Sequence, residues 1–488
     1  MSQTFRDNIL KISLLFFAGA FLLCASTHID PQASLDASYY KILAQQLDAG
    51  KGFKEPFIWQ HLNDYQHIEH EIDYWMPLGI IIYHIAFKIF GDSGGIGLNI
   101  LIWAVLCVLV YSDVYKQTTS RFSALIAFMT LLFGGRIIFF LLTTDNIAFY
   151  GLLGYLLFKT VDKIRFSWPA AGVISGIAAL TRIDGLIITA ISGILVYLRT
   201  RSLKTLLAFV AIVLLIVMPW MIRNKISTGI FWQSNYKAIF MTDYEDFFRP
   251  EFSGSLKNYF RQGLKTIIFQ KFDGLKASFF DFFVIPAFFI FIPLWLAGLA
   301  KTWSSNGGDF ALYLVIMWLF CGILFPFQAI KGTSMHISAF FFPYYSLLAG
   351  IGFSAFLEIM SKRKYVPKIT GAFLIAWVLY FTSIAISNYN QKYQFSKDNM
   401  RNLFSSYMPA QNQTIASRNP VQVYEITGCS GVIWPKSSND SPLRIAEKYN
   451  TDFIITESTG SFEVKSSAWQ VVASSSPLVM LKRLKKNK

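Results

Sequence analysis

Apolar runs alternate with short polar segments from residue 9 to residue 386. A membrane-spanning helix needs about 20 consecutive, mostly apolar residues. The runs that approach this length are 9–27, 76–91, 95–115, 120–142, 146–161, 167–182, 185–200, 203–222, 279–300, 309–330, 335–358 and 366–386. Phe dominates them, and Trp and Tyr lie near their ends, where amphipathic rings suit the headgroup region. The pattern predicts an all-α polytopic membrane protein.

Basic residues between the runs predict how the chain is threaded, because cytoplasmic loops are enriched in Lys and Arg. We expect the groups 199–204 and 362–368 in the cytoplasm, which leaves 28–75, 223–278 and the segment after 387 outside. Twelve crossings would put both ends on one side, against these charges. Counting 76–115 as one broken crossing, interrupted at Gly91, gives about 11 spans, with 11–13 as the range.

The segment after residue 387 is more polar and has short strand-like runs. These are Val421–Ile426, Asp452–Thr456 and Trp469–Ala473, and a helical pattern covers Ser441–Tyr449 between the first two. A β–α–β order is typical of a small α/β domain. We therefore expect a transmembrane catalytic domain over 1–386 and a small soluble external domain over 387–488.

Composition supports the membrane assignment. The chain has 54% hydrophobic and only 15% charged residues, whereas soluble chains carry about a quarter charged residues. The net charge of +15 is concentrated at the ends of the apolar runs. Such clusters are topology signals that also attract anionic lipid, so we do not expect a nucleic-acid partner. The four cysteines have neither a disulfide-framework spacing nor a zinc spacing.

The loop from residue 28 to residue 75 carries most of the candidate chemistry. A helical period runs from Asp36 to Leu47 and predicts an amphipathic helix lying in the membrane interface. Asp36 falls in its first turn, where the helix dipole stabilises a carboxylate. Taken alone, Asp36 is better explained as a residue that only supports the helix start.

Five of the six histidines lie between residues 28 and 84. His61, His67, His70 and Glu71 could ligate a metal, although their spacing matches no strong signature, and a solvated surface is the simpler interpretation. The run from Asp73 to Leu78 includes an aromatic anchor, Trp75, and a proline near a helix start, as at the beginning of a span.

Ionisable residues at membrane depth are costly and are often functional. Asp145 could cap the following span or take part in chemistry. Arg182 and Asp184 interrupt an apolar run and could form a local pair at a short turn. Lys331 and His336 could hold an anionic headgroup, or the lysine could simply extend to the interface.

In this order, these elements resemble the membrane glycosyltransferases of the GT-C superfamily. That group includes protein mannosyltransferases, lipid A aminoarabinose transferases and many bacterial relatives. The resemblance covers essentially the whole chain, including the external C-terminal segment. It rests on Asp36-x-x-Tyr39 after the first span, Asp73–Leu78, Thr144-Asp145-Asn146 and Gly332–His336. The histidines of the first loop have no counterpart in the family.

The resemblance implies an inverting transfer of a sugar from a polyprenyl-phosphate donor to a lipid, glycan or protein acceptor, at the outer face of the cytoplasmic membrane. By its match, Asp36 would be the base, with Asp145 as second catalytic residue. Arg182, Lys331 and Arg223 would bind the donor phosphate. Tyr39, His70, Asp73, Trp75 and His336 are placed on the substrate-binding surface. Whether Asp36 and Asp145 also hold a divalent metal is left open.

Two other classes fit parts of the sequence. A transporter or flippase of a lipid-linked or anionic substrate would also need charged groups at membrane depth, but repeated halves are not visible. An envelope polysaccharide polymerase or ligase would carry its chemistry in residues 223–278, which contain Asp243, Glu245, Asp246 and Arg249.

Overall fold

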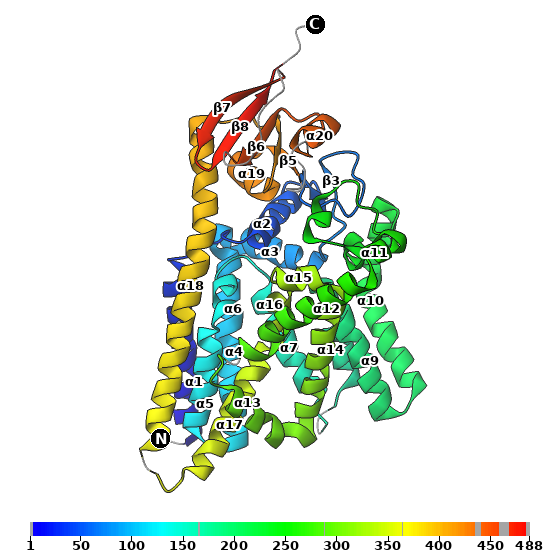
Figure 1. Cartoon of the computed structure of the whole chain (residues 1–488). Helices are drawn as coiled ribbons and strands as arrows, with labels where there is room; N and C mark the ends of the chain where they lie inside the picture. Colours follow the sequence, from blue (N-terminus) through cyan, green and yellow to red (C-terminus); the bar gives the residue numbers. More distant parts are fainter. Residues whose placement is uncertain are drawn as a thin grey trace. The chain divides into compact units, whose positions relative to one another are not determined.

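The computed structural model describes residues 3–163, 166–286, 288–363, 365–434, 441–457 and 468–484. The chain forms two compact units (Figure 1). Unit 1 consists of Met1–Pro31, Met76–Ile222 and Ile268–Tyr389, and unit 2 of Gln32–Trp75, Arg223–Ile267 and Asn390–Lys488. The first loop and the segment 223–267 thus group with the C-terminal segment. The domain boundary expected at residue 387 stays a prediction. Lys364 and residues 485–488 of the basic groups lie outside the described residues.

Unit 1 is built from helices. They are α1 (Gln3–Ser26), α3 (Pro77–Phe90), α4 (Gly94–Thr118), α5 (Arg121–Phe133), α6 (Arg136–Leu141), α7 (Ile147–Thr160), α8 (Trp168–Thr181), α9 (Gly185–Thr200), α10 (Leu203–Thr228), α12 (Leu264–Phe279), α13 (Ile292–Thr302), α14 (Gly308–Leu324), α15 (Pro326–Ile330), α16 (Thr333–Ser338), α17 (Phe342–Ile359) and α18 (Val366–Ser406). The ends of α10 and α18 and the start of α12 belong to unit 2.

Six stretches of helix in the described residues are long and apolar enough to cross a membrane. They are Phe5–Ser26, Pro77–Thr118, Leu203–Thr228, Ile292–Leu324, Phe342–Ile359 and Val366–Ser406. The shorter apolar helices α5, α7, α8 and α9 accompany them. The predicted interruption of 76–115 is present, because a 3₁₀ turn at Gly91–Ser93 separates α3 from α4 and Gly91 has a φ of 67°. The predicted polytopic helical fold is confirmed.

The helices differ in how much of their surface the protein covers. In α17, 72% of the span is buried, against 11% in α1 and 22% in α10. Helix α17 packs on α13 so closely that a Cβ at Gly298 or Gly352 would lie within 2.0 Å of a backbone oxygen of the partner helix. Small residues at such crossings let helices meet where the hydrophobic effect gives no driving force. Side chains such as Leu215, which is 78% exposed, face outward and suit lipid.

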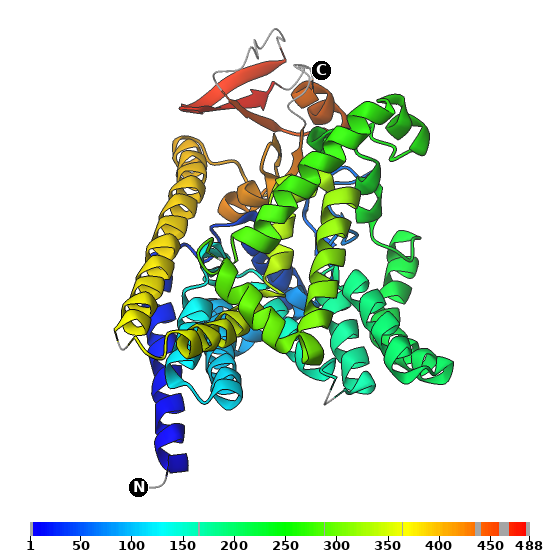
Figure 2. The same ribbon diagram turned by 60° about the horizontal axis from the view of Figure 1, so that its bottom comes forward.

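Unit 2 contains a six-stranded sheet flanked by short helices. Its elements are α2 (Leu35–Asp48), β1 (Lys54–Glu55), β2 (Phe57–Ile58), β3 (His70–Glu71), α11 (Leu256–Arg261), β4 (Thr414–Ser417), α19 (Pro420–Thr427), β5 (Ser430–Ile433), α20 (Ser441–Lys448), β6 (Phe453–Glu457), β7 (Trp469–Ser475) and β8 (Leu478–Arg483). The order is β2-β5-β4-β6-β8-β7. Strands β2, β5, β4 and β6 are parallel, and the antiparallel pair β7–β8 forms one end of the sheet, drawn in red in Figure 2.

Strand β2 comes from the first loop, which the sequence did not predict to be part of the sheet. Phe57 and Ile58 pair with Gly431 and Val432 of β5 and are fully buried. Two residues of strand leave too weak a pattern to recognise in a sequence, because a period of two needs several residues to appear. The first loop is therefore integrated into the core of unit 2.

The expected helix at Ser441 and the strands at Asp452 and Trp469 are confirmed. The expected strand Val421–Ile426 is wrong, because these residues form α19. Asn419 caps this helix by accepting from Gln422, Pro420 occupies its first turn, and Gly428 ends it with a φ of 71°. These end signals outweigh the strand preference of the β-branched residues between them.

Candidate active site

The loop between α6 and α7 in unit 1 holds the buried carboxylate of Asp145. The Asn99 amide donates to the carbonyls of Leu141, Thr143 and Asp145 at 3.2, 2.8 and 3.2 Å, and the Tyr83 hydroxyl donates to the Asp145 carbonyl. The backbone of the loop is thus fixed from inside the helix bundle. Asp145 does not cap α7, because Asn146 occupies the N-cap position and makes no side-chain capping bond.

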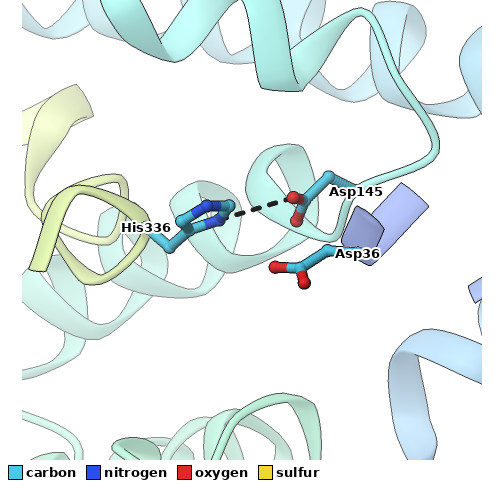
Figure 3. Close-up of side chains that lie close together, drawn as sticks. All are labelled: Asp36, Asp145 and His336. Carbon is cyan, nitrogen blue, oxygen red and sulfur yellow. Dashed lines mark ion pairs between the residues drawn. The ribbon is translucent and has the colours of Figure 1, made fainter. Parts of the chain in front are cut away.

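The Asp145 side chain is directed toward His336. Its Oδ2 lies 3.4 Å from Nδ1 of His336 on α16, and Figure 3 shows the imidazole facing the carboxylate. The Phe140 ring packs edge-on against this imidazole, with 4.9 Å between centroids. Asp145 is fully buried and His336 is nearly so. A carboxylate and an imidazole in contact are groups that can exchange a proton or bind a cation.

Arg182 and Asp184 form the expected local pair. The Arg182 Nε donates to Asp184 Oδ1 at 3.0 Å, and the Tyr150 hydroxyl donates to the same carboxylate. Both charged residues are more than 90% buried, and the guanidinium lies over the Tyr150 ring. The Asn146 amide, beside Asp145, donates to the carbonyl of Thr181 at 3.3 Å, which links this turn to the Asp145 loop.

A second arginine pair, partly buried, was missed in the sequence. Arg136 donates to Asp281 at 3.2 Å and to the Tyr389 hydroxyl at 2.6 Å, while Ser334 donates to the other oxygen of Asp281 at 2.5 Å. Ser334 lies on α16, the helix that carries His336. The sequence does contain a signal for this pair. Arg136 follows two glycines inside an apolar run, where a charged residue is costly and therefore notable.

Lys331 lies between α15 and α16 and is exposed. An apolar groove lies between α9 and α10. It has a volume of about 380 Å³ and is lined by Thr189, Ala190, Gly193, Ile194, Tyr197, Leu198, Leu206, Phe209, Val210, Val213 and Leu214. The groove begins one helical turn after Gly185, the first residue of α9.

Asp36 is carried by α2 in unit 2. Ser34 caps the helix by accepting from the Ala37 amide at 3.1 Å, so Asp36 is not needed as a cap. Ser38 donates to Glu425 at 2.7 Å and Gln46 donates to Tyr424 at 2.8 Å, both on α19. The apolar face that the sequence placed in the membrane interface is therefore packed within the protein.

The neighbourhood of Asp36 in unit 2 includes Tyr244, which the sequence did not single out. Burial and then the Asp36 carboxylate raise the pKa of Tyr244 to about 12, so the hydroxyl stays protonated. The adjoining Glu245 receives Arg418 at 3.2 Å. Asp243 and Asp246 both receive Arg249 and cap the turn Tyr244–Phe248. The carboxylates of this segment are thus engaged in holding its own conformation.

Three of the histidines and acids of the first loop are buried. His61 and Glu55 are 1% and 0% exposed and Asp73 is 5% exposed. The interpretation of the set His61, His67, His70 and Glu71 as a solvated surface is therefore wrong for His61, which is buried in unit 2, whereas His67 is exposed. His61 contacts the Ile433 carbonyl and His70 contacts Glu55. Among the described residues, the four ligands expected from this loop, His61, His67, His70 and Glu71, belong to no cluster of three or more metal-ligating groups.

Three other predicted site residues lie in the same unit. Arg223 donates to Glu71 and to the carbonyls of Ile72 and Phe53, at 3.0 and 2.8 Å for the carbonyls. The Tyr39 hydroxyl donates to Glu55 at 2.5 Å. Trp75 is partly exposed and stacks on Trp59 with 5.9 Å between centroids.

The covalent chain limits how far Asp36 can lie from Asp145. Within unit 1 the Thr144 amide donates to the Pro31 carbonyl at 3.0 Å, so the end of the first segment is bound to the residue before Asp145. Asp36 follows Pro31 by five residues. Since an extended chain spans at most about 3.6 Å per residue, the Asp36 Cα lies within about 18 Å of that of Pro31.

Neither a family model nor a curated protein matches the sequence. Among solved structures, ArnT from Cupriavidus metallidurans matches in the apo state with a TM-score of 0.58 and 10% identity, over 99% of both chains. ArnT bound to undecaprenyl phosphate matches with a TM-score of 0.57 and 11% identity, over 98% of both chains. An oligosaccharyltransferase from Archaeoglobus fulgidus, in complex with Zn and sulfate, matches with a TM-score of 0.51 and 13% identity, over 91% of this chain and 68% of that chain.

These similarities extend over both units, from the first helix to the C-terminal sheet. At identities of 10–13% they concern the fold. The resemblance to membrane glycosyltransferases that the sequence indicates is confirmed at this level: the chain is a multi-pass membrane protein with the fold of ArnT.

Proposed function

We propose that the protein is an inverting glycosyltransferase that moves a sugar from a polyprenyl-phosphate donor to an acceptor at the outer face of the cytoplasmic membrane. The observation that carries the proposal is the buried Asp145–His336 pair. The bond from the Thr144 amide to the Pro31 carbonyl limits how far Asp36 can lie from Asp145, because Asp36 follows Pro31 by only five residues. A similar fold is found in ArnT, which has been crystallised with undecaprenyl phosphate. A polyprenyl-phosphate donor suits both observations.

In this reaction the acceptor hydroxyl attacks the anomeric carbon of the sugar while the bond to the donor phosphate breaks. Asp36 takes the proton of the hydroxyl as the new bond forms, which requires a carboxylate within hydrogen-bond reach of that hydroxyl. Asp145 orients the acceptor or Asp36, and the neighbouring His336 holds Asp145 in place. Tyr39, His70, Asp73 and Trp75 shape the loop that carries this surface.

The leaving phosphate gains negative charge as the bond breaks, so fixed cations near it stabilise the transition state. We propose Arg182 as the principal one, because Asp184 and Tyr150 hold its guanidinium in a fixed orientation. Lys331, which is exposed, is the second. Arg223 is the weakest candidate, since its donors already serve Glu71 and two carbonyls.

The groove between α9 and α10 is proposed as the seat of the polyprenyl tail. Its walls are mostly apolar side chains, and its first lining residue, Thr189, follows Asp184 by five residues along the chain. A donor with its phosphate at Arg182 can therefore place isoprene units along α9.

A divalent ion fits the donor set but is not required by it. Asp145 and His336 offer an oxygen and a nitrogen 3.4 Å apart, close to the spacing of two ligands on one ion. Asp36 would be a third ligand. When bound, such an ion would stabilise negative charge on the phosphate, while the residues named above would keep their roles in binding and proton transfer.

The decisive experiment replaces Asp36 by Asn in membrane vesicles supplied with radiolabelled undecaprenyl-phosphate sugars and an envelope extract. Loss of a general base lowers turnover about 10²- to 10⁴-fold. Asp48→Asn, at the exposed end of the same helix, is the matched control and keeps full activity. Turnover that survives in Asp36→Asn contradicts the assignment. Right-side-out vesicles should accept added acceptor and inverted vesicles should not, if the site faces outward.

A further inference from the structure

The first loop contains a buried ionic group that the proposed chemistry does not use. Glu55 on β1 is fully buried, and its Oε2 lies 3.5 Å from Nε2 of His70 on the neighbouring β3. In the described part of the chain neither of these two atoms has a hydrogen bond. The two charges therefore depend on each other, because removing one leaves the other buried and uncompensated.

The second oxygen of Glu55 connects this pair to the helix that carries Asp36. Glu55 Oε1 accepts the Tyr39 hydroxyl at 2.5 Å. Tyr39 is 2% exposed and lies three residues after Asp36 on α2. Residues three apart on a helix are neighbours on its surface. A shift of Tyr39 therefore rotates or tilts the turn that presents Asp36.

Helix α2 is also held by α19. Ser38 donates to Glu425, which in turn receives Lys397 at 2.5 Å, and Gln46 donates to Tyr424. The anchors at Ser38 and Gln46 hold the start and the end of the helix. The Tyr39–Glu55 bond is a third anchor, next to Ser38 in the first two turns, so it contributes to the orientation of Asp36.

We infer that Glu55, His70 and Tyr39 are positioning residues, and that the protonation of His70 sets the orientation of α2 and thereby of Asp36. For catalysis this inference rests on the proposed role of Asp36. With His70 protonated, the Glu55 carboxylate is compensated and holds Tyr39. With His70 neutral, the Glu55 anion is left buried and uncompensated beside a second carboxylate, Asp73, which destabilises the arrangement that holds Tyr39.

The surroundings of His70 support a charge change near neutral pH. Burial alone would lower its pKa, but Glu55 and Asp73 outweigh burial and raise that pKa above its usual value. The Tyr65 ring lies 3.9 Å from the imidazole and its hydroxyl donates to Asp73.

Other charged groups face this cluster from neighbouring elements. Arg223, near the end of α10, forms an ion pair with Glu71 of β3, and Lys237 interacts with Asp73. Lys54 of β1 forms an ion pair with Glu69, and the charge of His70 acts on His61. Burial lowers the pKa of Arg223 and of Lys237 from their usual values, which lie well above neutral pH. His70 is the group of this cluster whose usual pKa lies nearest neutral and whose pKa is raised from there.

Hydrogen–deuterium exchange tests the inference without relying on activity. In the full chain in nanodiscs, we expect the amides of α2 to exchange several-fold faster at pH 8.5 than at pH 6.5, after correction for intrinsic rates, while α19 changes little. His70→Gln should remove this pH dependence. His67→Gln, an exposed histidine of the same loop, is the control and should keep it.

Two further variants keep the test decisive if His70→Gln is too unstable to study. Glu55→Gln/His70→Gln replaces the ion pair by a neutral one, and should restore the fold while giving pH-independent exchange in α2. Tyr39→Phe removes the link, so α2 should exchange fast at both pH values. If α2 in the double variant still responds to pH as in the wild type, the inference is wrong.

Kinetics then separates the inference from the proposed function. The alkaline limb of kcat against pH should disappear in the double variant, with the donor KM changed less than twofold. If Asp36→Asn abolishes turnover but the double variant retains the alkaline limb, the positioning role fails and the glycosyltransferase assignment stands. If the exchange of α2 depends on His70 but Asp36→Asn is fully active, the role of His70 in positioning α2 stands and the assignment of Asp36 as the base fails.

Discussion

Two buried groups of the first loop should affect the stability of unit 2 with opposite signs as pH changes. Burial and then Glu55 raise the pKa of Asp73 to about 6, while burial lowers the pKa of His61 to about 4. In the wild-type protein the two effects on the free energy of unfolding largely cancel. We predict that Asp73→Asn and His61→Gln each remove one of them, so that the unfolding free energy of each variant depends on pH.

The sign follows from which state binds more protons. The unfolded Asp73 carboxyl titrates near 3.9 and the folded one near 6, so the folded state binds more protons in between and loses stability as pH rises from 4 to 6. The unfolded His61 titrates near 6.5 and the folded one near 4. The unfolded state then binds more protons, and stability rises with pH from 4 to 6.5.

The magnitudes are similar. Each shift is about 2 to 2.5 pH units, and one unit corresponds to 1.36 kcal/mol, so each group changes the free energy of unfolding by about 3 kcal/mol. Both side chains are at least 95% buried, so solvent screening reduces these values little. Between pH 4 and pH 6 the two contributions offset each other to within about 1 kcal/mol.

Native-state hydrogen exchange of the slowest amides in β4 and β5 gives the opening free energy of this part of the fold at each pH. Relative to wild type, Asp73→Asn should gain about 3 kcal/mol from pH 4 to pH 6, and His61→Gln should lose about as much. The control is Asp64→Asn, an exposed residue of the same loop. Opening free energies of Asp73→Asn that run parallel to wild type across this range would refute the reasoning.

Three further predictions concern the proposed site. Arg182→Gln should lower donor turnover about 10²- to 10³-fold, as loss of a fixed charge at a developing anion does, with Arg201→Gln, an exposed arginine at the far end of α9, as the unaffected control. Ala190→Trp should fill the groove between α9 and α10, raising the KM for a long-chain donor while leaving a two-isoprene donor unchanged; equal effects on both donors would exclude the groove as the tail site. His336→Ala should weaken zinc or manganese binding at least about tenfold by equilibrium dialysis, and identical binding by both proteins would place the ion elsewhere.

The membrane fold could be predicted because its cause is local. An apolar run of span length has few other stable placements, so the helices of unit 1 follow from hydropathy. The strand predictions for the C-terminal segment succeeded where β-branched runs lacked helix end signals. They failed at Val421–Ile426, where Asn419, Pro420 and Gly428 specify a helix.

The grouping of the first loop with the C-terminal segment could not be predicted, since it depends on contacts between residues more than 300 positions apart. Strand β2 has two residues, and the bonds of α2 to α19 join Ser38 to Glu425 and Gln46 to Tyr424. A single sequence carries no signal of such pairings. For the same reason Asp145 and His336 were each singled out by their cost in a membrane, but their contact was not foreseen.

The burial of the first loop changes what its charges mean. A row of acids and histidines on a solvated face would tolerate substitution, since exposed ion pairs contribute about 0–1 kcal/mol each. Glu55 and Asp73 are instead buried, and His70 contacts Glu55, so one unpaired charge there costs several kcal/mol. One hydrogen bond, from Tyr39 to Glu55, joins this cluster to the turn after Asp36. A change in the charge of the cluster therefore acts on the helix that carries Asp36, which is the physical basis of the positioning role that we infer.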